Sequence, residues 1–127
     1  MEVLDSVTST KAAARPFADV HNIWEIVLHI ITWKEVAHKQ ISGNNWAPTD
    51  EEDWPQVGEV SDSAWQLTLA TLKKTQSRLV ETVTRLNDSQ LDETVPAHDY
   101  SIYVLLHGVV QHDLYHAGQI ALLKKHL

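Results

Sequence analysis

Three long segments of this sequence repeat apolar residues at steps of three and four, the period of an α-helix with one buried face. The most regular segment begins after Ser61, a residue suited to cap a helix, and carries Asp62 in its first turn. Its predicted buried stripe follows an unbroken alternation of four- and three-residue steps: Trp65, Leu69, Leu72, Gln76, Leu79, Val83 and Leu86. The four prolines all lie outside the three segments. This pattern predicts an all-α protein.

The other two segments flank this one in the chain. The first predicted helix runs from about Val20 to Ser42, and Lys34 is the single polar residue on its apolar face. The last predicted helix starts near Ser101 and continues to the end of the sequence. Its apolar stripe contains two histidines, His112 and His116, in place of aliphatic side chains.

Polar connections separate the helical segments. The 43–60 linker is acidic and long, whereas residues 11–14 and the 87–100 connection each have room for a short helical turn. We therefore predict one helical domain over residues 1–127, a bundle of the up-down type whose neighbouring helices run antiparallel.

The charge balance limits the classes of partner. Seventeen acidic residues against ten basic ones give a net charge of −7, which disfavours binding to nucleic acid or to an anionic membrane. The N-terminal residues do not resemble a signal peptide, and no apolar run reaches the length of a membrane span. We expect a cytoplasmic protein.

The absence of cysteine restricts metal chemistry to histidine and carboxylate ligands, and the sequence contains eight histidines. His112 and His116 are four residues apart, so a helix points both imidazoles in nearly the same direction. Two core histidines hydrogen-bonded to their neighbours would also explain the pair. His29, on the border of the first helix's apolar face, is the best-placed third ligand from another helix.

The remaining histidines compete poorly for this role: His21, His38, His98, His107 and His126. A zinc-protease helix is a weaker interpretation, because it requires a glutamate after the first histidine and this chain has Asp113 there. No nucleophile elbow or phosphate-binding glycine loop is present.

Two stretches resemble the DinB/YfiT-like superfamily. They are the 107–120 segment, HGVVQHDLYHAGQI, and the 22–33 segment, NIWEIVLHIITW. The similarity extends from about Ala14 to Leu123 and includes Arg15-Pro16 and Asp53-Trp54-Pro55. One difference is that members usually have a long helix before the Arg-Pro segment, whereas only fourteen residues precede it here, so the first family helix is expected to be missing or shortened.

The resemblance implies a four-helix bundle with a divalent metal ion, nickel or zinc, held by His29, His112 and His116. Related proteins include thiol-dependent transferases and isomerases and metal-dependent hydrolases. We therefore expect a metal-dependent enzyme that activates water or a low-molecular-weight thiol and acts on a small-molecule substrate. A non-catalytic, metal-stabilised binding or stress-response module is the alternative.

Several further residues carry weaker expectations. Gln119 is a candidate to orient a ligand and Tyr115 a candidate donor to substrate, while Trp46 and Trp54 either cover the site or anchor the linker. The acidic 50–53 run is expected to be solvated. A homodimer would cover the face that the missing helix leaves open; alternatively, residues 1–14 fold over part of it.

Overall fold

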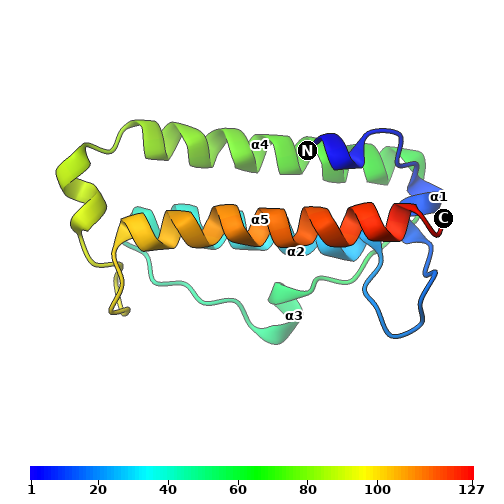
Figure 1. The fold of residues 1–127 in the computed structure, drawn as a ribbon, viewed down its shortest axis with the longest axis horizontal. Helices are drawn as coiled ribbons and strands as arrows, with labels where there is room; N and C mark the ends of the chain where they lie inside the picture. The colour runs from blue at the N-terminus through cyan, green and yellow to red at the C-terminus, as the bar shows by residue number, and fades with distance from the viewer.

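Three long helices carry the fold of this protein, which a computed structural model describes over residues 1–127 (Figure 1). They are α2 (Ile23–Ile41), α4 (Asp62–Thr84) and α5 (Ile102–Lys124). Short helical elements precede and connect them: η1 (Glu2–Leu4), α1 (Ser9–Ala13), α3 (Asp50–Asp53) and η2 (Asp88–Asp92). There are no strands, so the predicted all-α fold is confirmed. None of the helices combines the length and apolar character needed to cross a membrane.

The long helices begin where capping side chains satisfy their first N–H groups. Ser61 and Ser101 each accept a hydrogen bond from the backbone N–H three residues later, as their positions in the sequence predict. The first long helix begins at Ile23 instead of the predicted Val20. Asn22 and Glu25 form a capping box there, in which each side chain accepts from the other's backbone N–H, and this fixes the start.

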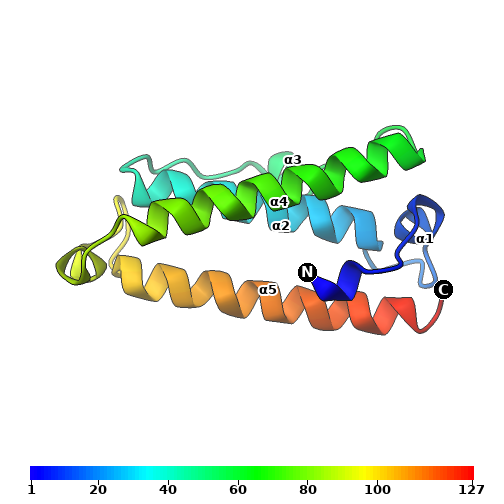
Figure 2. The same ribbon diagram turned by 90° about the horizontal axis from the view of Figure 1, so that it is seen from above.

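The direction of the helices differs in one respect from the predicted up-down order. Trp24 Nε1 donates to Thr68 near the start of α2 and α4, and His38 contacts Thr82 near their ends, so these two helices run parallel. The 42–61 linker makes this possible by running back along the bundle (Figure 1). Helix α5 is antiparallel to both, as expected (Figure 2).

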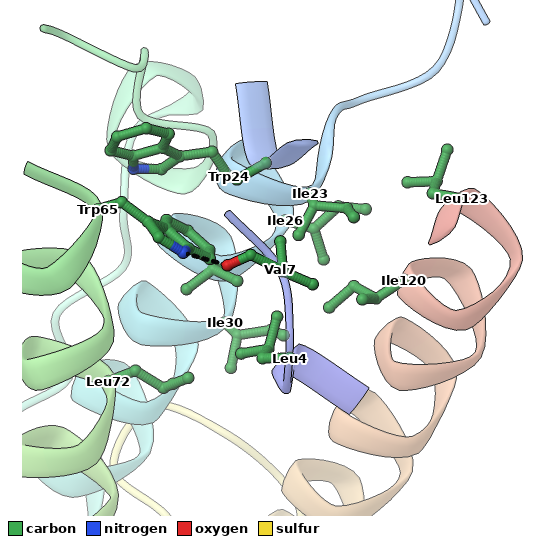
Figure 3. Close-up of a cluster of buried hydrophobic side chains, with 12 residues drawn as sticks. Leu4, Val7, Ile23, Trp24, Ile26, Ile30, Trp65, Leu72, Ile120 and Leu123 are labelled. Atoms are coloured by element: carbon green, nitrogen blue, oxygen red, sulfur yellow. Dashed lines mark hydrogen bonds between the residues drawn. The ribbon is translucent and has the colours of Figure 1, made fainter. Parts of the chain in front are cut away.

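No long helix precedes α2, and the N-terminal residues contribute to the core in another way. Leu4, Val7 and Ala12 are buried. Trp65 Nε1 donates to the Val7 carbonyl at 2.8 Å (Figure 3). Lys124 Nζ donates to the carbonyls of Val3 and Asp5. These contacts hold η1 between α4 and α5 (Figure 2). Residues 1–14 thus cover part of the face between α4 and α5, one of the two arrangements that the sequence left open.

The main core lies where α2 meets this segment, α4 and the end of α5 (Figure 3). Its buried members are apolar throughout: Leu4, Val7, Ala12, Ile23, Trp24, Ile26, Val27, Ile30, Trp65, Leu72, Ile120 and Leu123. One predicted stripe residue, Gln76, is exposed, because α4 and α5 do not close against each other at that level. Lys34, the polar residue on the α2 stripe, is buried and forms an ion pair with Asp113.

Candidate metal centre

The structure brings His29, His112 and His116 together between α2 and α5. The Nε2 atom of His112 lies 3.0 Å from that of His29 and 3.1 Å from that of His116. His29 and His116 are buried, and His112 is partly exposed. The four-residue spacing on α5 aligns two of these rings, and the antiparallel packing of α2 supplies the third. This is the set of histidines predicted from the sequence.

The linker fixes the orientation of the His29 ring. Its Nδ1 lies 2.8 Å from the backbone carbonyl of Asp53 and 3.0 Å from that residue's Oδ1. Both oxygens can only accept a hydrogen bond, so the Nδ1 atom of His29 carries the proton and donates. In the neutral form of the ring, which is the form that binds a metal, the lone pair then lies on Nε2, which faces His112.

A side-chain amide does the same for His116. The Nδ1–H of His116 donates to Gln119 Oε1 at 2.6 Å, and the amide nitrogen of Gln119 donates to the Tyr115 hydroxyl at 3.3 Å. This arrangement again leaves Nε2 as the unprotonated atom. Gln119, a candidate from the sequence, therefore contacts the outer nitrogen of His116. Tyr115 is exposed, and its hydroxyl contacts the amide on the Nδ1 side of the ring, away from the cluster.

The three converging Nε2 atoms fit a metal ion better than they fit a hydrogen-bonded network. With protons on Nδ1 of His29 and His116, only His112 can place a proton between the rings, and one N–H cannot point at two separate acceptors at once. Lone pairs about 3 Å apart are stabilised by a shared cation. Neutral imidazoles bind zinc and nickel, with metal–nitrogen distances of about 2.0–2.1 Å for zinc. The donor set therefore fits a divalent transition metal.

Local electrostatics keep two of these rings neutral. Burial is the main cause that lowers the pKa of His112 to about 4, and the neighbouring His116 and His29 lower it further. Burial also lowers the pKa of His116, although its hydrogen bond to Gln119 opposes this shift. Neutral imidazole is the form that binds a metal, so both side chains are ready to act as ligands near pH 7.

Trp54 covers one side of the cluster. Its indole stacks on His29 with ring centroids 3.8 Å apart and on His21 with centroids 3.7 Å apart, both nearly parallel at 4°. Trp46, by contrast, lies under the ammonium group of Lys39 at 4.2 Å. One linker tryptophan therefore covers the site and the other anchors the chain elsewhere.

The expectation that the acidic 50–53 run is simply solvated is wrong for its last residue. Asp53 is only partly exposed, and its carboxylate accepts from Trp33 Nε1 at 2.6 Å as well as facing His29. The capping box that begins α3 at Thr49 sets this geometry, because the short helix ends at Asp53 and directs its backbone carbonyl toward α2. The family resemblance included the 53–55 segment, but the contact of Asp53 with His29 was not predicted from the sequence.

The other histidines lie outside the cluster, as predicted, and contact other partners. His38 bonds to Thr82, and the rings of His98, His107 and His126 pack against aromatic side chains of residues 100, 103 and 17. His21 is the exception, since it reaches the site indirectly through Trp54. Sequence spacing could not show this contact, because it depends on the course of the linker.

The fold and the cluster together define a class of protein: an all-α bundle in which two facing helices present three histidines to one point. Residues 1–120 match the DinB superfamily, and the chain belongs to that superfamily. Searches of curated proteins and of solved structures gave no match.

Proposed function

We propose that this protein is a metal-dependent enzyme that binds one divalent ion, nickel or zinc, through His29, His112 and His116. In this proposal the site activates water or a low-molecular-weight thiol, so that the protein acts as a hydrolase or a thiol S-transferase on a small-molecule substrate. The observation that carries the proposal is the convergence of three Nε2 atoms whose rings are oriented from behind. Membership of the DinB superfamily supports it.

Three histidine ligands leave at least one coordination position of a divalent ion for water or substrate, and such an ion acts as a Lewis acid that lowers the pKa of what it binds. The chain itself has no cysteine, so a sulfur nucleophile would have to come from a second molecule. This is why a low-molecular-weight thiol is a suitable reactant.

The protein's own residues perform three tasks in this scheme. Asp53 and Gln119 hold the protons on the outer nitrogens of His29 and His116, which keeps the inner nitrogens available. Trp54 excludes water from one side of the His29 ring. His112 lies at the more open side of the cluster, where a reactant can enter.

A second candidate function is structural. The cluster joins α2 to α5 through residues 83 positions apart in sequence, so a bound ion would cross-link two helices whether or not chemistry follows. In that case the protein is a non-catalytic binding or stress-response module whose metal only stabilises it.

Metal analysis tests the first step. Protein purified without an affinity tag should contain or take up about one nickel or zinc ion per chain, measured by elemental analysis and titration calorimetry. His29→Ala should weaken binding sharply, whereas His107→Ala, which removes an exposed histidine of α5 outside the cluster, should not. Unchanged affinity in His29→Ala would refute the three-histidine site.

Solvent access and turnover separate the two candidates. If the site is catalytic, a paramagnetic substitute such as cobalt should enhance the relaxation of exchanging water protons, and thiol transfer or ester hydrolysis should depend on added metal. A loaded protein with no exchangeable water and no turnover against a panel of thiols, electrophiles and esters would favour the structural role.

A further inference from the structure

A cavity of about 320 Å³ lies between α2 and α5 beside the histidine cluster. His112 belongs to both, and Trp33 forms part of the cavity wall with its ring 6.1 Å from that of His112. The volume is at the lower end of the range for pockets that bind small molecules. The cavity is thus continuous with the side of the cluster that the linker does not cover.

The lining of this cavity is apolar along its length. Seven of its eleven lining residues are hydrophobic. Of the other four, Lys34 and Asp113 neutralise each other in an ion pair, Gly108 has no side chain, and His112 lies at the metal end. The ion pair leaves no net charge among these residues, and the only buried oxygen without a hydrogen-bond partner among them is Asp113 Oδ1, so an uncharged and mainly apolar group suits the cavity.

The helix geometry gives the length of the cavity. Its lining residues on α5 extend from Val104 to Asp113, which corresponds to about 13.5 Å at 1.5 Å per residue. This length suits a medium-length alkyl or acyl chain or a two-ring aromatic group. A polar thiol would lose its hydration among these side chains without compensation, so the cavity fits the other reactant.

Two features indicate that the cavity is maintained in an open form. Trp33 is held in the wall by the hydrogen bond from its indole N–H to Asp53. Gly108 lies in the interior of α5, where glycine is less favourable than alanine, yet a Cβ there would contact nothing. Helix packing therefore does not require this glycine, while a larger side chain would take space from the cavity.

We propose that this cavity binds the apolar part of the substrate, an uncharged alkyl or aryl group, and that the reacting polar group of the same molecule lies at the His112 end. The proposal rests on the proposed function for the position of the reacting group. The binding of the apolar group itself does not depend on a metal.

The first test uses two hydroxamic acids that share a metal-binding head and differ in their tail. On the nickel- or zinc-loaded protein, calorimetry should show octanohydroxamate binding at least about 100-fold more tightly than acetohydroxamate, since each buried methylene adds about 0.8 kcal/mol. Equal affinities for the two probes would overturn the proposal.

Two variants test whether the alkyl tail of octanohydroxamate binds in this cavity. Gly108→Leu, which fills the cavity, and Val104→Asp, which puts a charge at its far end, should each reduce the preference for the longer probe by at least tenfold. The matched controls on the same helix are Gly118→Leu, where a Cβ also meets nothing, and Leu114→Asp at an exposed position outside the cavity. The controls should keep the preference. A preference that survives Gly108→Leu and Val104→Asp would show that the tail binds elsewhere and would overturn the proposal.

An experiment on the metal-free protein tests the apolar site independently of the proposed metal-dependent function. In the metal-free protein, octan-1-ol should shift the NMR signals of the Trp33 indole and the Gly108 and Ala37 amides, and these shifts should be lost in Val104→Asp. If no metal binds but these shifts occur, the proposed function fails and the apolar site stands. If a metal binds and the alcohol shifts none of these signals, the apolar site fails alone.

Discussion

Replacing Gln119 by leucine isolates the contribution of a residue that touches no reactant. Gln119→Leu preserves the approximate size of the side chain but removes the oxygen that accepts the Nδ1–H of His116 at 2.6 Å. No other acceptor bonds to this nitrogen in the structure, so the ring loses the contact that fixes its protonation and its orientation.

The expected magnitude follows from this geometry. Removing a hydrogen-bond partner behind a histidine ligand lowers metal affinity by roughly 10- to 100-fold, which is about 1.4–2.7 kcal/mol. Asp53→Asn should have a smaller effect than Gln119→Leu, because His29 Nδ1 keeps its bond to the backbone carbonyl at 2.8 Å after the carboxylate is changed.

Competition titration of nickel or zinc against a chromophoric chelator measures these affinities directly. Tyr115→Phe is the matched control, since it removes only the hydroxyl that receives the Gln119 amide hydrogen at 3.3 Å and should change the affinity by less than about threefold. Circular dichroism of the metal-free variants checks that all of them are folded. An unchanged dissociation constant in folded Gln119→Leu would refute the orienting role.

Three further predictions concern the whole protein. The metal-free protein should have a lower free energy of unfolding in urea at pH 5 than at pH 7. Folded His112 has a pKa of about 4, whereas a histidine in the unfolded chain has a pKa near 6.5, so the unfolded chain binds a proton at pH 5 that the folded protein does not. Equal free energies at the two pH values would contradict this. Lys34→Met should lower the free energy of unfolding by about 3–5 kcal/mol, because it leaves the Asp113 carboxylate unpaired in a half-buried position. The control Lys39→Met, at the surface, should lower the free energy of unfolding by less than about 1 kcal/mol. We expect a homodimer in which the apolar groove between α4 and α5, flanked by Val80 and Val110, is covered by a second copy; light scattering of metal-loaded protein at micromolar concentration that gives a monomer mass would exclude it.

The periodicity of the sequence was sufficient to predict the long helices and the meeting of three histidines. Each of these features depends on local spacing: caps at Ser61 and Ser101, and a four-residue step between His112 and His116. The choice of His29 depended in addition on its position at the border of an apolar face. Caps, residue spacing and apolar faces depend only on residues within one helix, so they can be predicted from the sequence before the packing of the helices is known.

The path of the 42–61 linker was beyond these rules. The direction of the linker makes α2 and α4 parallel and brings the Asp53 carbonyl to His29. A hydrogen bond to a backbone carbonyl does not depend on the residue type, so the sequence could not predict this contact. The partner of Lys34 was hidden for a related reason, because Asp113 is 79 residues away and faces it only after α5 has packed. Long-range contacts of this kind depend on topology, which periodicity does not encode.

The distance along the chain between His29 and His112 has a consequence for biosynthesis. At typical rates of translation, the 83 positions that separate them take roughly 4 to 17 s to synthesise. During that interval the emerging chain offers His29 without its two companions on α5, and a lone imidazole retains a transition metal weakly. In the proposed metal site, loading would therefore follow the docking of α5, so an ion held by all three histidines would mark a chain in which this helix has already packed against α2.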